Sequence, residues 1–256
     1  MNSLACKNCG NAVADSFCPR CGQSAGVGRL QFRELAGQVL DALVDWDGRL
    51  WTTLRGLTLR PGQVCAEYVD GRRQSYVPPL RYCLLALLLN LLIGQFISVE
   101  IDADLPASMS AEQQQAFHAL FLEFRQLAVA HADWVALIGV PLIALLYRLL
   151  MWGRQRNLAE CMAFALYLCG HISVLMALFS PIKWLGPGAA ALLRVLVLSL
   201  MYCIAARVFF AVGWWRALIS SLLVVAASFL ISFLALIALA WWQGSLQPAI
   251  AVLRAG

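Results

Sequence analysis

The chain has 256 residues, of which 61% are hydrophobic and 13% are charged. Soluble domains average about 45–50% apolar and about 25% charged residues, so this composition excludes an ordinary soluble globular protein. The formal net charge of +5 would suit a nucleic-acid-binding protein. Most of the basic residues flank apolar segments, however, where they orient a chain in a membrane. We therefore expect the lipid bilayer, and no nucleic acid, among the partners.

The charges divide the chain into a polar head and an apolar remainder. Residues 1–81 contain ten of the 19 Lys and Arg residues and seven of the 14 Asp and Glu residues. The first 28 residues lack the apolar stretch of a signal peptide, so we expect the head to stay in a reducing compartment. The predicted domains are a cysteine module at 1–26, amphipathic interfacial helices at 27–79 and a membrane domain at 80–256.

Four of the nine cysteines form two Cys-x-x-Cys pairs, Cys6 with Cys9 and Cys18 with Cys21. A glycine follows each pair and permits the left-handed turn that directs backbone N–H groups at the sulfurs. Two such pairs make a closed tetrahedral zinc site, and metal binding supplies most of the folding free energy of so short a module. The pattern predicts a structural zinc ribbon with these four ligands. Iron is an alternative metal, whereas a disulfide or a redox motif suits the compartment and the surrounding sequence less well.

Residues 27–79 contain three short stretches of helical hydrophobic periodicity. The first runs from Phe32 to Val44, the second from Leu50 to Leu57, and the third passes Glu67 and ends at Gly71. Tryptophans and arginines beside an apolar face are typical of a membrane interface. Four arginines are candidates for contacts with anionic lipid head groups: Arg60, Arg72, Arg73 and Arg81. The alternative is a solvated basic flank that packs on the membrane domain.

Five segments are apolar and long enough to cross a bilayer as helices. They are residues 80–99, 134–152, 158–180, 189–212 and 217–242. With the N-terminus inside, 15 of the 19 Lys and Arg residues lie on the inner side, which is the positive-inside pattern. Five spans place the C-terminus outside, and the acidic loop 100–133 is predicted to form an outer amphipathic helix. The expected fold is therefore an all-α polytopic membrane protein with a small ribbon. A bundle of five spans is thin, which is compatible with self-association.

Glu160, Tyr167 and His171 share one face of the third predicted span. Ionisable groups inside a membrane are candidates for function because they are costly there, and this face could line a polar cavity or relay a proton. The alternative pairs Glu160 with an arginine at the interface and His171 with a neighbouring helix. The sequence has no Gly-rich phosphate loop, His-Glu-x-x-His motif or nucleophile elbow. We therefore expect no catalytic residues and a protein that is not an enzyme.

A series of short motifs in the first ninety residues resembles a known family. They are Phe17-Cys18-Pro19-Arg20-Cys21-Gly22, Trp51-Thr52-Thr53-Leu54, Arg60-Pro61-Gly62, Glu67-Tyr68-Val69-Asp70-Gly71-Arg72-Arg73 and Tyr76-Val77-Pro78. In combination they are similar to a family of bacterial inner-membrane proteins classed as a domain of unknown function. The resemblance implies zinc and the bacterial inner membrane, and it implies no activity.

The expected function follows from a closed metal module joined to a bundle with few buried charges. We expect a non-enzymatic membrane protein whose ribbon and interfacial helices bind a protein partner at the cytoplasmic face. The alternative is a small transporter, channel or lipid-handling protein that uses the face formed by Glu160, Tyr167 and His171.

Overall fold

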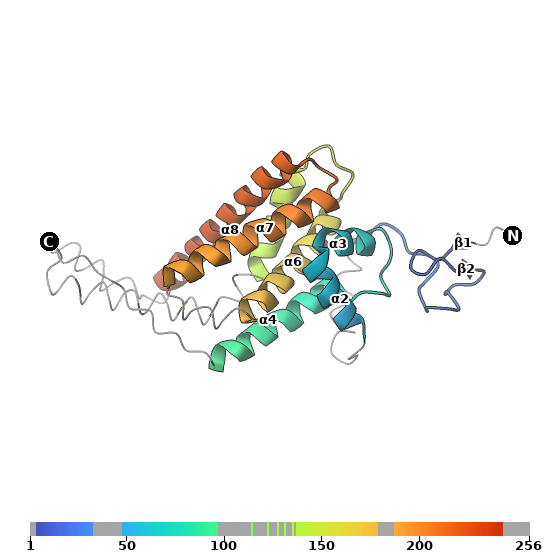
Figure 1. The fold of residues 1–256 in the computed structure, drawn as a ribbon, viewed down its shortest axis with the longest axis horizontal. Helices are drawn as coiled ribbons and strands as arrows, with labels where there is room; N and C mark the ends of the chain where they lie inside the picture. The colour runs from blue at the N-terminus through green and yellow to red at the C-terminus, as the bar shows by residue number, and fades with distance from the viewer. Residues whose placement is uncertain are drawn as a thin grey trace.

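The structure is a computed structural model that describes residues 4–32, 48–96, 137–178 and 187–242, together with single positions at 114, 122, 127, 131 and 135. Apart from one small N-terminal sheet, the described elements are helices. The predicted all-helical architecture is confirmed. Figure 1 shows these helices side by side in a bundle, with the N-terminal module beside one of its ends.

The N-terminal module consists of two chain reversals of similar size. In the first, β1 (Leu4–Ala5) pairs with β2 (Ala12–Val13) in an antiparallel sheet. In the second, an antiparallel bridge joins Phe17 to Ser24. Each reversal carries one Cys-x-x-Cys pair. The buried core of the module contains Val13 and the cysteines, which is too little apolar surface to hold so short a chain folded.

Two short helices, α2 (Arg49–Leu59) and α3 (Pro61–Val69), lie at the end of the bundle nearest this module (Figure 1). Proline at the first position of α3 suits a helix start, because an N–H there would have no partner within the helix. The first turn of α3 lies directly on α7. A Cβ atom on Gly62 would lie 2.6 Å from the carbonyl oxygen of Ala205, so this contact requires glycine.

The most extensive helix contact joins α4 (Pro79–Phe96) to α6 (Leu158–Leu178). The two backbones approach closely at Gly170, where a Cβ atom would lie 2.8 Å from the Cα atom of Cys83. Small residues at such crossings are typical of helix packing in membranes. The second helix pair, α7 (Pro187–Phe209) and α8 (Trp214–Trp242), packs antiparallel through a short turn.

Aromatic side chains fill the bundle core toward the end where α7 finishes. Phe164 stacks on Phe209 with ring centroids 4.7 Å apart, and Tyr147 stacks on Phe210 at 5.6 Å. Tyr147 comes from a further helical segment, Leu137–Leu150, so this cluster joins three parts of the bundle. Such contacts contribute both buried area and preferred ring geometry.

Each predicted span contains a described helical segment, whose described bounds lie within a few residues of the predicted ones. Within the described ranges, two helices are both long and apolar enough to cross a membrane, namely α6 and α8. Of these, α6 is mostly buried in the bundle, whereas α8 is mostly exposed. The predicted amphipathic helix that follows Phe32 and nearly all of the predicted outer loop 100–133 lie outside the described residues.

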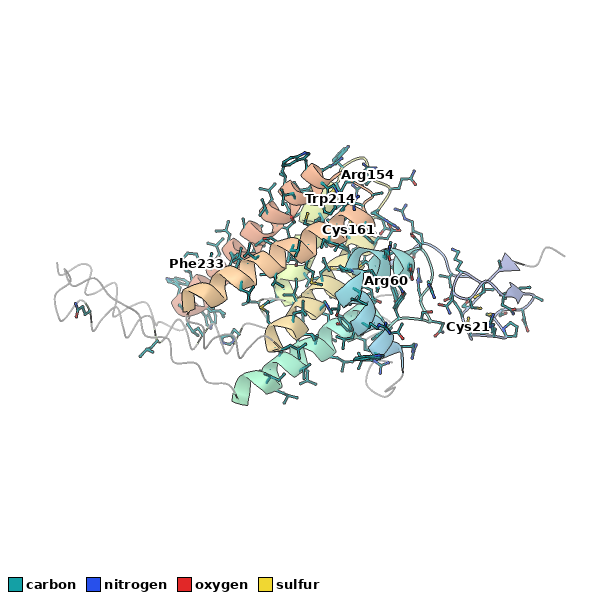
Figure 2. The ribbon with its side chains drawn as sticks, in the orientation of Figure 1. Cys21, Arg60, Arg154, Cys161, Trp214 and Phe233 are labelled. Carbon is teal, nitrogen blue, oxygen red and sulfur yellow. The ribbon has the colours of Figure 1, made fainter. Side chains whose placement is uncertain are left out.

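Basic turns gather at the end of the bundle that carries the N-terminal module. Arg156, in the turn before α6, binds Asp70 after α3 with an N–O distance of 2.6 Å. Arg216, at the start of α8, donates hydrogen bonds to the carbonyl oxygens of Leu150 and Trp152. Figure 2 shows Arg154, Trp214 and Arg60 toward this end and Phe233 toward the other. The segments predicted to face inside therefore lie together.

Candidate metal centre

Each Cys-x-x-Cys pair forms a knuckle, a tight turn in which backbone groups surround the sulfurs. The N–H group of Gly10 donates to the carbonyl oxygen of Cys6 at 2.8 Å, and that of Gly22 donates to Cys18 at 2.9 Å. Both glycines have positive φ, +75° and +71°. This is the left-handed conformation that glycine adopts without steric cost, so the predicted role of the two glycines is confirmed.

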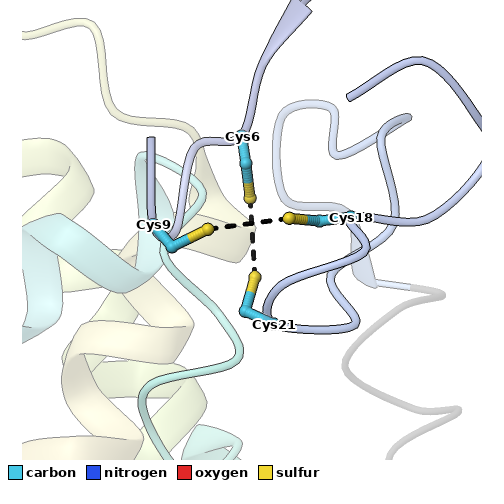
Figure 3. Close-up of side chains that lie close together, drawn as sticks. All are labelled: Cys6, Cys9, Cys18 and Cys21. Atoms are coloured by element: carbon cyan, nitrogen blue, oxygen red, sulfur yellow. Dashed lines mark hydrogen bonds between the residues drawn. The ribbon is translucent and has the colours of Figure 1, made fainter. Parts of the chain in front are cut away.

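The two knuckles bring the four sulfurs of Cys6, Cys9, Cys18 and Cys21 within 4.8 Å of one another (Figure 3). The Sγ–Sγ distance is 3.6 Å both from Cys6 to Cys21 and from Cys9 to Cys18. Four sulfurs about 2.3 Å from one tetrahedral zinc ion would lie about 3.8 Å apart. The cysteine sulfurs therefore fit a single four-coordinate metal ion, and the predicted ligand set could hold one.

Backbone hydrogen bonds favour the thiolate form of part of this cluster. The N–H of Cys9 contributes most to lowering the pKa of Cys6. Burial opposes ionisation of Cys18, but hydrogen bonds from backbone N–H groups, chiefly that of Cys21, and from the thiols of Cys9 and Cys21 together lower its pKa to about 6. At Cys9 the N–H of Asn11 also favours the thiolate, yet burial and the other three sulfurs raise the pKa to about 11. Four thiolates this close together would repel one another, and a bound cation would offset that repulsion.

One side chain of the second knuckle joins the metal centre to the bundle. Gln23 follows the knuckle directly, and its carbonyl oxygen accepts a 2.8 Å hydrogen bond from the N–H of Cys18. Its side-chain amide donates to the carbonyl oxygen of Gly71 at 2.8 Å. Its amide oxygen accepts from the backbone N–H groups of Arg73 and Gln74 at 3.2 and 3.3 Å. The Gln23 residue is only 3% exposed.

Three further contacts hold the module on the same loop, residues 71–75. Asn8 in the first knuckle accepts a 2.7 Å hydrogen bond from the hydroxyl of Ser75. The side chain of Lys7 packs over Gly71, where a Cβ atom would lie 2.6 Å from Lys7 Cδ. The Arg73 guanidinium donates to the carbonyl oxygen of Gly28 at 2.9 Å. Both knuckles therefore touch the loop between α3 and α4.

The chain that leaves the module is anchored at the start of α6. Arg29 forms an ion pair with Glu160 at 2.7 Å and also donates to the carbonyl oxygen of Gln155. Leu30, next in sequence, is completely buried in the bundle core. Asn157 and Glu160 cap α6 reciprocally, since each side chain accepts a 2.8 Å hydrogen bond from the backbone N–H of the other. Glu160 therefore both starts a helix and holds the N-terminal segment.

The other two residues of the predicted polar face have separate partners. His171 is completely buried, with Nδ1 2.8 Å from the Tyr82 hydroxyl and Nε2 3.2 Å from Thr58 Oγ1. The Tyr167 hydroxyl donates to the carbonyl oxygen of Val77 at 2.5 Å. The structure therefore distributes Glu160, Tyr167 and His171 among three different contacts and does not bring them into one site. A role in transport for this face remains a prediction.

Two of the four predicted lipid-contact arginines share a carboxylate. Glu67 lies 3.1 Å from Arg72 and 4.0 Å from Arg60, and it accepts a 2.5 Å hydrogen bond from the Tyr76 hydroxyl. Burial, followed by this carboxylate, raises the pKa of Tyr76 to about 12. We call these four residues the Glu67 cluster. Both arginine side chains are about half exposed, so the cluster presents positive charge at the surface.

The remaining two arginines lie beside the cluster in different roles. Arg73 faces the N-terminal module through its bond to Gly28, and Arg81 is half-buried in the first turn of α4.

Gln23 and Arg29 were not found by sequence reasoning. Neither belongs to a local motif, and each acts on residues distant in the chain, so no local signal could have identified them. The Asn-x-x-Glu cap at Asn157 was a local signal that could have been read.

The comparisons with known proteins bear on α2, α3 and the first part of α4. Residues 47–90 match the model of a family described as a protein of unknown function, DUF3667. This segment contains the Glu67 cluster and the loop that receives the module, and it includes four of the five motifs noted in the sequence. No curated protein and no solved structure matches the chain.

Proposed function

We propose that this chain is a multi-pass protein of the bacterial inner membrane, and that its zinc ribbon binds a protein partner at the cytoplasmic face. In this proposal the ribbon is structural and the protein is not an enzyme. Zinc bound by four cysteine ligands has no open position for a substrate. Its contribution when bound is the folding free energy of the module.

The outer face of α8 supports the membrane location. Its side chains are large and apolar and are half or more exposed at Leu222, Leu230, Phe233 and Leu234. Soluble monomers rarely expose so large a contiguous apolar surface, whereas a bilayer covers it. Among the described helices α8 is also the longest, and none of its residues after Arg216 is charged. The proposal adds the other apolar helices as further spans.

Basic residues at one end of the bundle support a cytoplasmic N-terminus. The ribbon, the turn with Arg156 and the start of α8 with Arg216 share that end, and positive charge is retained on the cytoplasmic side. The Trp214 ring, stacked beneath the Arg207 guanidinium at 4.1 Å, has the amphipathic character of an interface residue. The exposed arginines of the Glu67 cluster are then placed to contact anionic lipid head groups.

The observation that carries the partner-binding proposal is a large exposed side chain on the metal-stabilised module. Phe17 is 63% exposed, although an aromatic ring of this size gains free energy from burial. Pro19 and Arg20 beside it are exposed as well. Aromatic and arginine side chains are enriched at protein interfaces. Phe17, Pro19 and Arg20 therefore offer an exposed surface on the module for a partner.

Photo-crosslinking from Phe17 tests this proposal directly. A benzoylphenylalanine placed at Phe17 in living cells should yield one discrete protein adduct. The adduct should disappear when Cys6, Cys9, Cys18 and Cys21 are all replaced by serine. The same probe at Phe32, which is 48% exposed but outside the ribbon, is the matched control. No adduct, or an adduct that survives loss of the cysteines, would contradict partner binding by the folded ribbon.

A cavity within the bundle favours lipid handling as a second candidate function. It has a volume of about 210 Å³ and is lined by the segment Leu137–Leu150, α6, α7 and α8, including Ser173, Tyr202 and Ser228. The hydroxyls of Ser173 and Ser228 bond to carbonyl oxygens of their own helices, which leaves a mainly apolar lining. The residues Glu160, Tyr167 and His171 do not line it, so this candidate relies on a different face of α6.

Filling the cavity tests the second candidate. Ser228→Phe should reduce the amount of lipid that remains bound in native mass spectrometry, because the larger ring occupies the apolar volume. Leu222→Phe, on the exposed face of the same helix, is the control and should retain lipid as the wild type does. Equal retention in both variants would argue against a lipid-binding cavity.

A further inference from the structure

The position of Gln23 depends on the metal centre. Its backbone carbonyl oxygen is bonded to the N–H of Cys18, and it directly follows Gly22, the residue that closes the second knuckle. The module has almost no apolar core besides Val13 and the four cysteines. Without a metal, the knuckles have little to hold them folded, and the Gln23 side chain is then no longer fixed in place.

The loop of residues 71–75 depends in turn on Gln23. One amide side chain satisfies three backbone groups, the carbonyl oxygen of Gly71 and the N–H groups of Arg73 and Gln74. Gly71 is buried, Arg73 is half-buried and Gln74 is exposed, and each of these backbone groups loses a hydrogen bond when the Gln23 side chain moves away. The N–H of Arg73 has a second acceptor, the carbonyl oxygen of Gly71 at 3.0 Å. The Gln74 N–H is therefore the more sensitive reporter of Gln23.

This loop connects the metal centre to the Glu67 cluster. Arg72 belongs to both the loop and the cluster, and Tyr76 follows the loop immediately. Val77 then leads into α4, with its N–H bonded to Thr53 Oγ1 at 2.9 Å. A change in the loop therefore reaches the basic residues that face the proposed membrane interface, while the start of α4 stays held by α2.

We propose that Gln23 makes the ribbon a metal-dependent clamp on residues 71–75. With the metal bound, the clamp fixes the loop and orients Arg72 toward Glu67. Loss of the metal releases the loop and frees Arg72 from Glu67. Gln23 is a positioning residue, since it acts on the cluster through the loop. The inference rests on the metal binding in the proposed function and is independent of the protein partner.

Hydrogen exchange in the full-length protein, reconstituted in lipid nanodiscs, tests the clamp. Zinc-loaded and chelator-treated samples are compared for the wild type and for Gln23→Met, which keeps the side-chain volume but removes its amide. Gln63→Met is the matched control, because Gln63 is exposed on α3. The amide of Tyr82, bonded to the carbonyl oxygen of Pro78 at the start of α4, is the internal reference.

In the wild type and in Gln63→Met, chelation should accelerate exchange at Gln74 at least about fivefold, as loss of one hydrogen bond predicts. In Gln23→Met the amide should exchange at the fast rate even with zinc bound, and Tyr82 should not change in any sample. The clamp is overturned if wild-type exchange in the loop is the same with and without zinc, or if zinc-loaded Gln23→Met is as protected as the wild type.

Native mass spectrometry of the same samples separates this inference from the proposed function. Wild type and Gln23→Met should each carry one zinc ion, since the four cysteines are intact in both. Wild type without zinc would overturn the metal site and the clamp together. Zinc binding with an unresponsive loop would overturn the clamp alone, whereas a responsive loop without a Phe17 adduct would support the clamp and contradict the partner.

Discussion

At the scale of single residues, two buried tyrosine hydroxyls differ in whether they are paired. Tyr82 OH lies 2.8 Å from Nδ1 of His171. The Thr58 hydroxyl donates to the carbonyl oxygen of Leu54, so it accepts from Nε2–H of His171. The neutral imidazole is then satisfied on both nitrogens when Tyr82 donates to Nδ1. Tyr147 OH is buried without a hydrogen-bond partner in the described part of the chain.

Removing these two hydroxyls should therefore have different effects. Tyr82→Phe leaves a buried nitrogen of His171 without its donor and should lower the free energy of unfolding by about 1–3 kcal/mol. Tyr147→Phe removes an unpaired polar atom and should change it little or raise it. Equilibrium unfolding in mixed micelles measures both. Equal losses in the two variants would show that the hydroxyl environments are alike.

Gly71 adopts a backbone conformation that favours glycine over other residues. It follows α3 with φ +119°, and the hydrogen bonds from Gly71 to Tyr68 and from Arg72 to Glu67 are those of a Schellman helix end. Gly71→Ala should destabilise the protein by about 1–3 kcal/mol, because a Cβ is strained at this φ and meets Lys7. Gly28→Ala, where a Cβ meets nothing within 4 Å, is the control. A matching change at Gly28 would refute the backbone explanation.

At the scale of helices, glycine has opposite roles in two parts of the bundle. Gly170 of α6 lies against the backbone of α4, whereas a Cβ on Gly139 would have no heavy atom within 4 Å. Where a Cβ has open space, replacing glycine by alanine stabilises a helix by up to about 1 kcal/mol. Where the Cβ meets a neighbouring backbone, overpacking destabilises the protein by about 1–3 kcal/mol.

Gly170→Ala should therefore lower the melting temperature of the purified protein, and Gly139→Ala should raise it. Both are single glycine-to-alanine changes inside apolar helices, so the sign of the shift isolates the contact between α4 and α6. A higher melting temperature for Gly170→Ala would mean that these helices can separate at no cost.

At the scale of the whole molecule, basic residues of the described ranges gather at one end of the bundle. The Arg156–Asp70 ion pair and the ribbon contacts lie at the basic end, while α8 runs from Trp214 at this end to Trp242 at the other. Figure 1 shows the two ends of α8 at opposite ends of the bundle. This polarity suits a chain whose N-terminus is inside and whose last helix leaves the cytoplasm.

Reporter fusions test this orientation in a bacterial host. A fluorescent protein fused before Met1 should fold and fluoresce, since the proposal puts that side in the cytoplasm. Alkaline phosphatase fused after Gly256 should be active, because the five predicted spans would put the C-terminus outside, where its disulfides form. Replacing Arg154 and Arg156 by glutamate should lower the phosphatase signal by weakening the inside charge bias. An inactive C-terminal phosphatase in the unchanged protein would imply an even number of spans.

Local patterns in the sequence predicted much of the fold and the ligand set of the candidate site. The spacing of four cysteines around two glycines predicted the knuckles, because a Cys-x-x-Cys turn is formed by residues adjacent in the chain. The apolar runs predicted helices over residues 80–99 and 217–242, close to α4 and α8. The termination of α3 at Gly71 was likewise a local property.

The tertiary structure alone decided how these parts meet. Glu160 pairs with Arg29, 131 residues away, and Gln23 bonds a loop 48 to 51 residues further along. His171 has its partners on α2 and α4. Such pairings depend on which helices lie together, and helices of similar hydrophobicity can pack in many ways. The sequence by itself therefore determined the cysteines of the candidate metal centre and the helices, whereas long-range packing determined which residues connect that centre to the bundle.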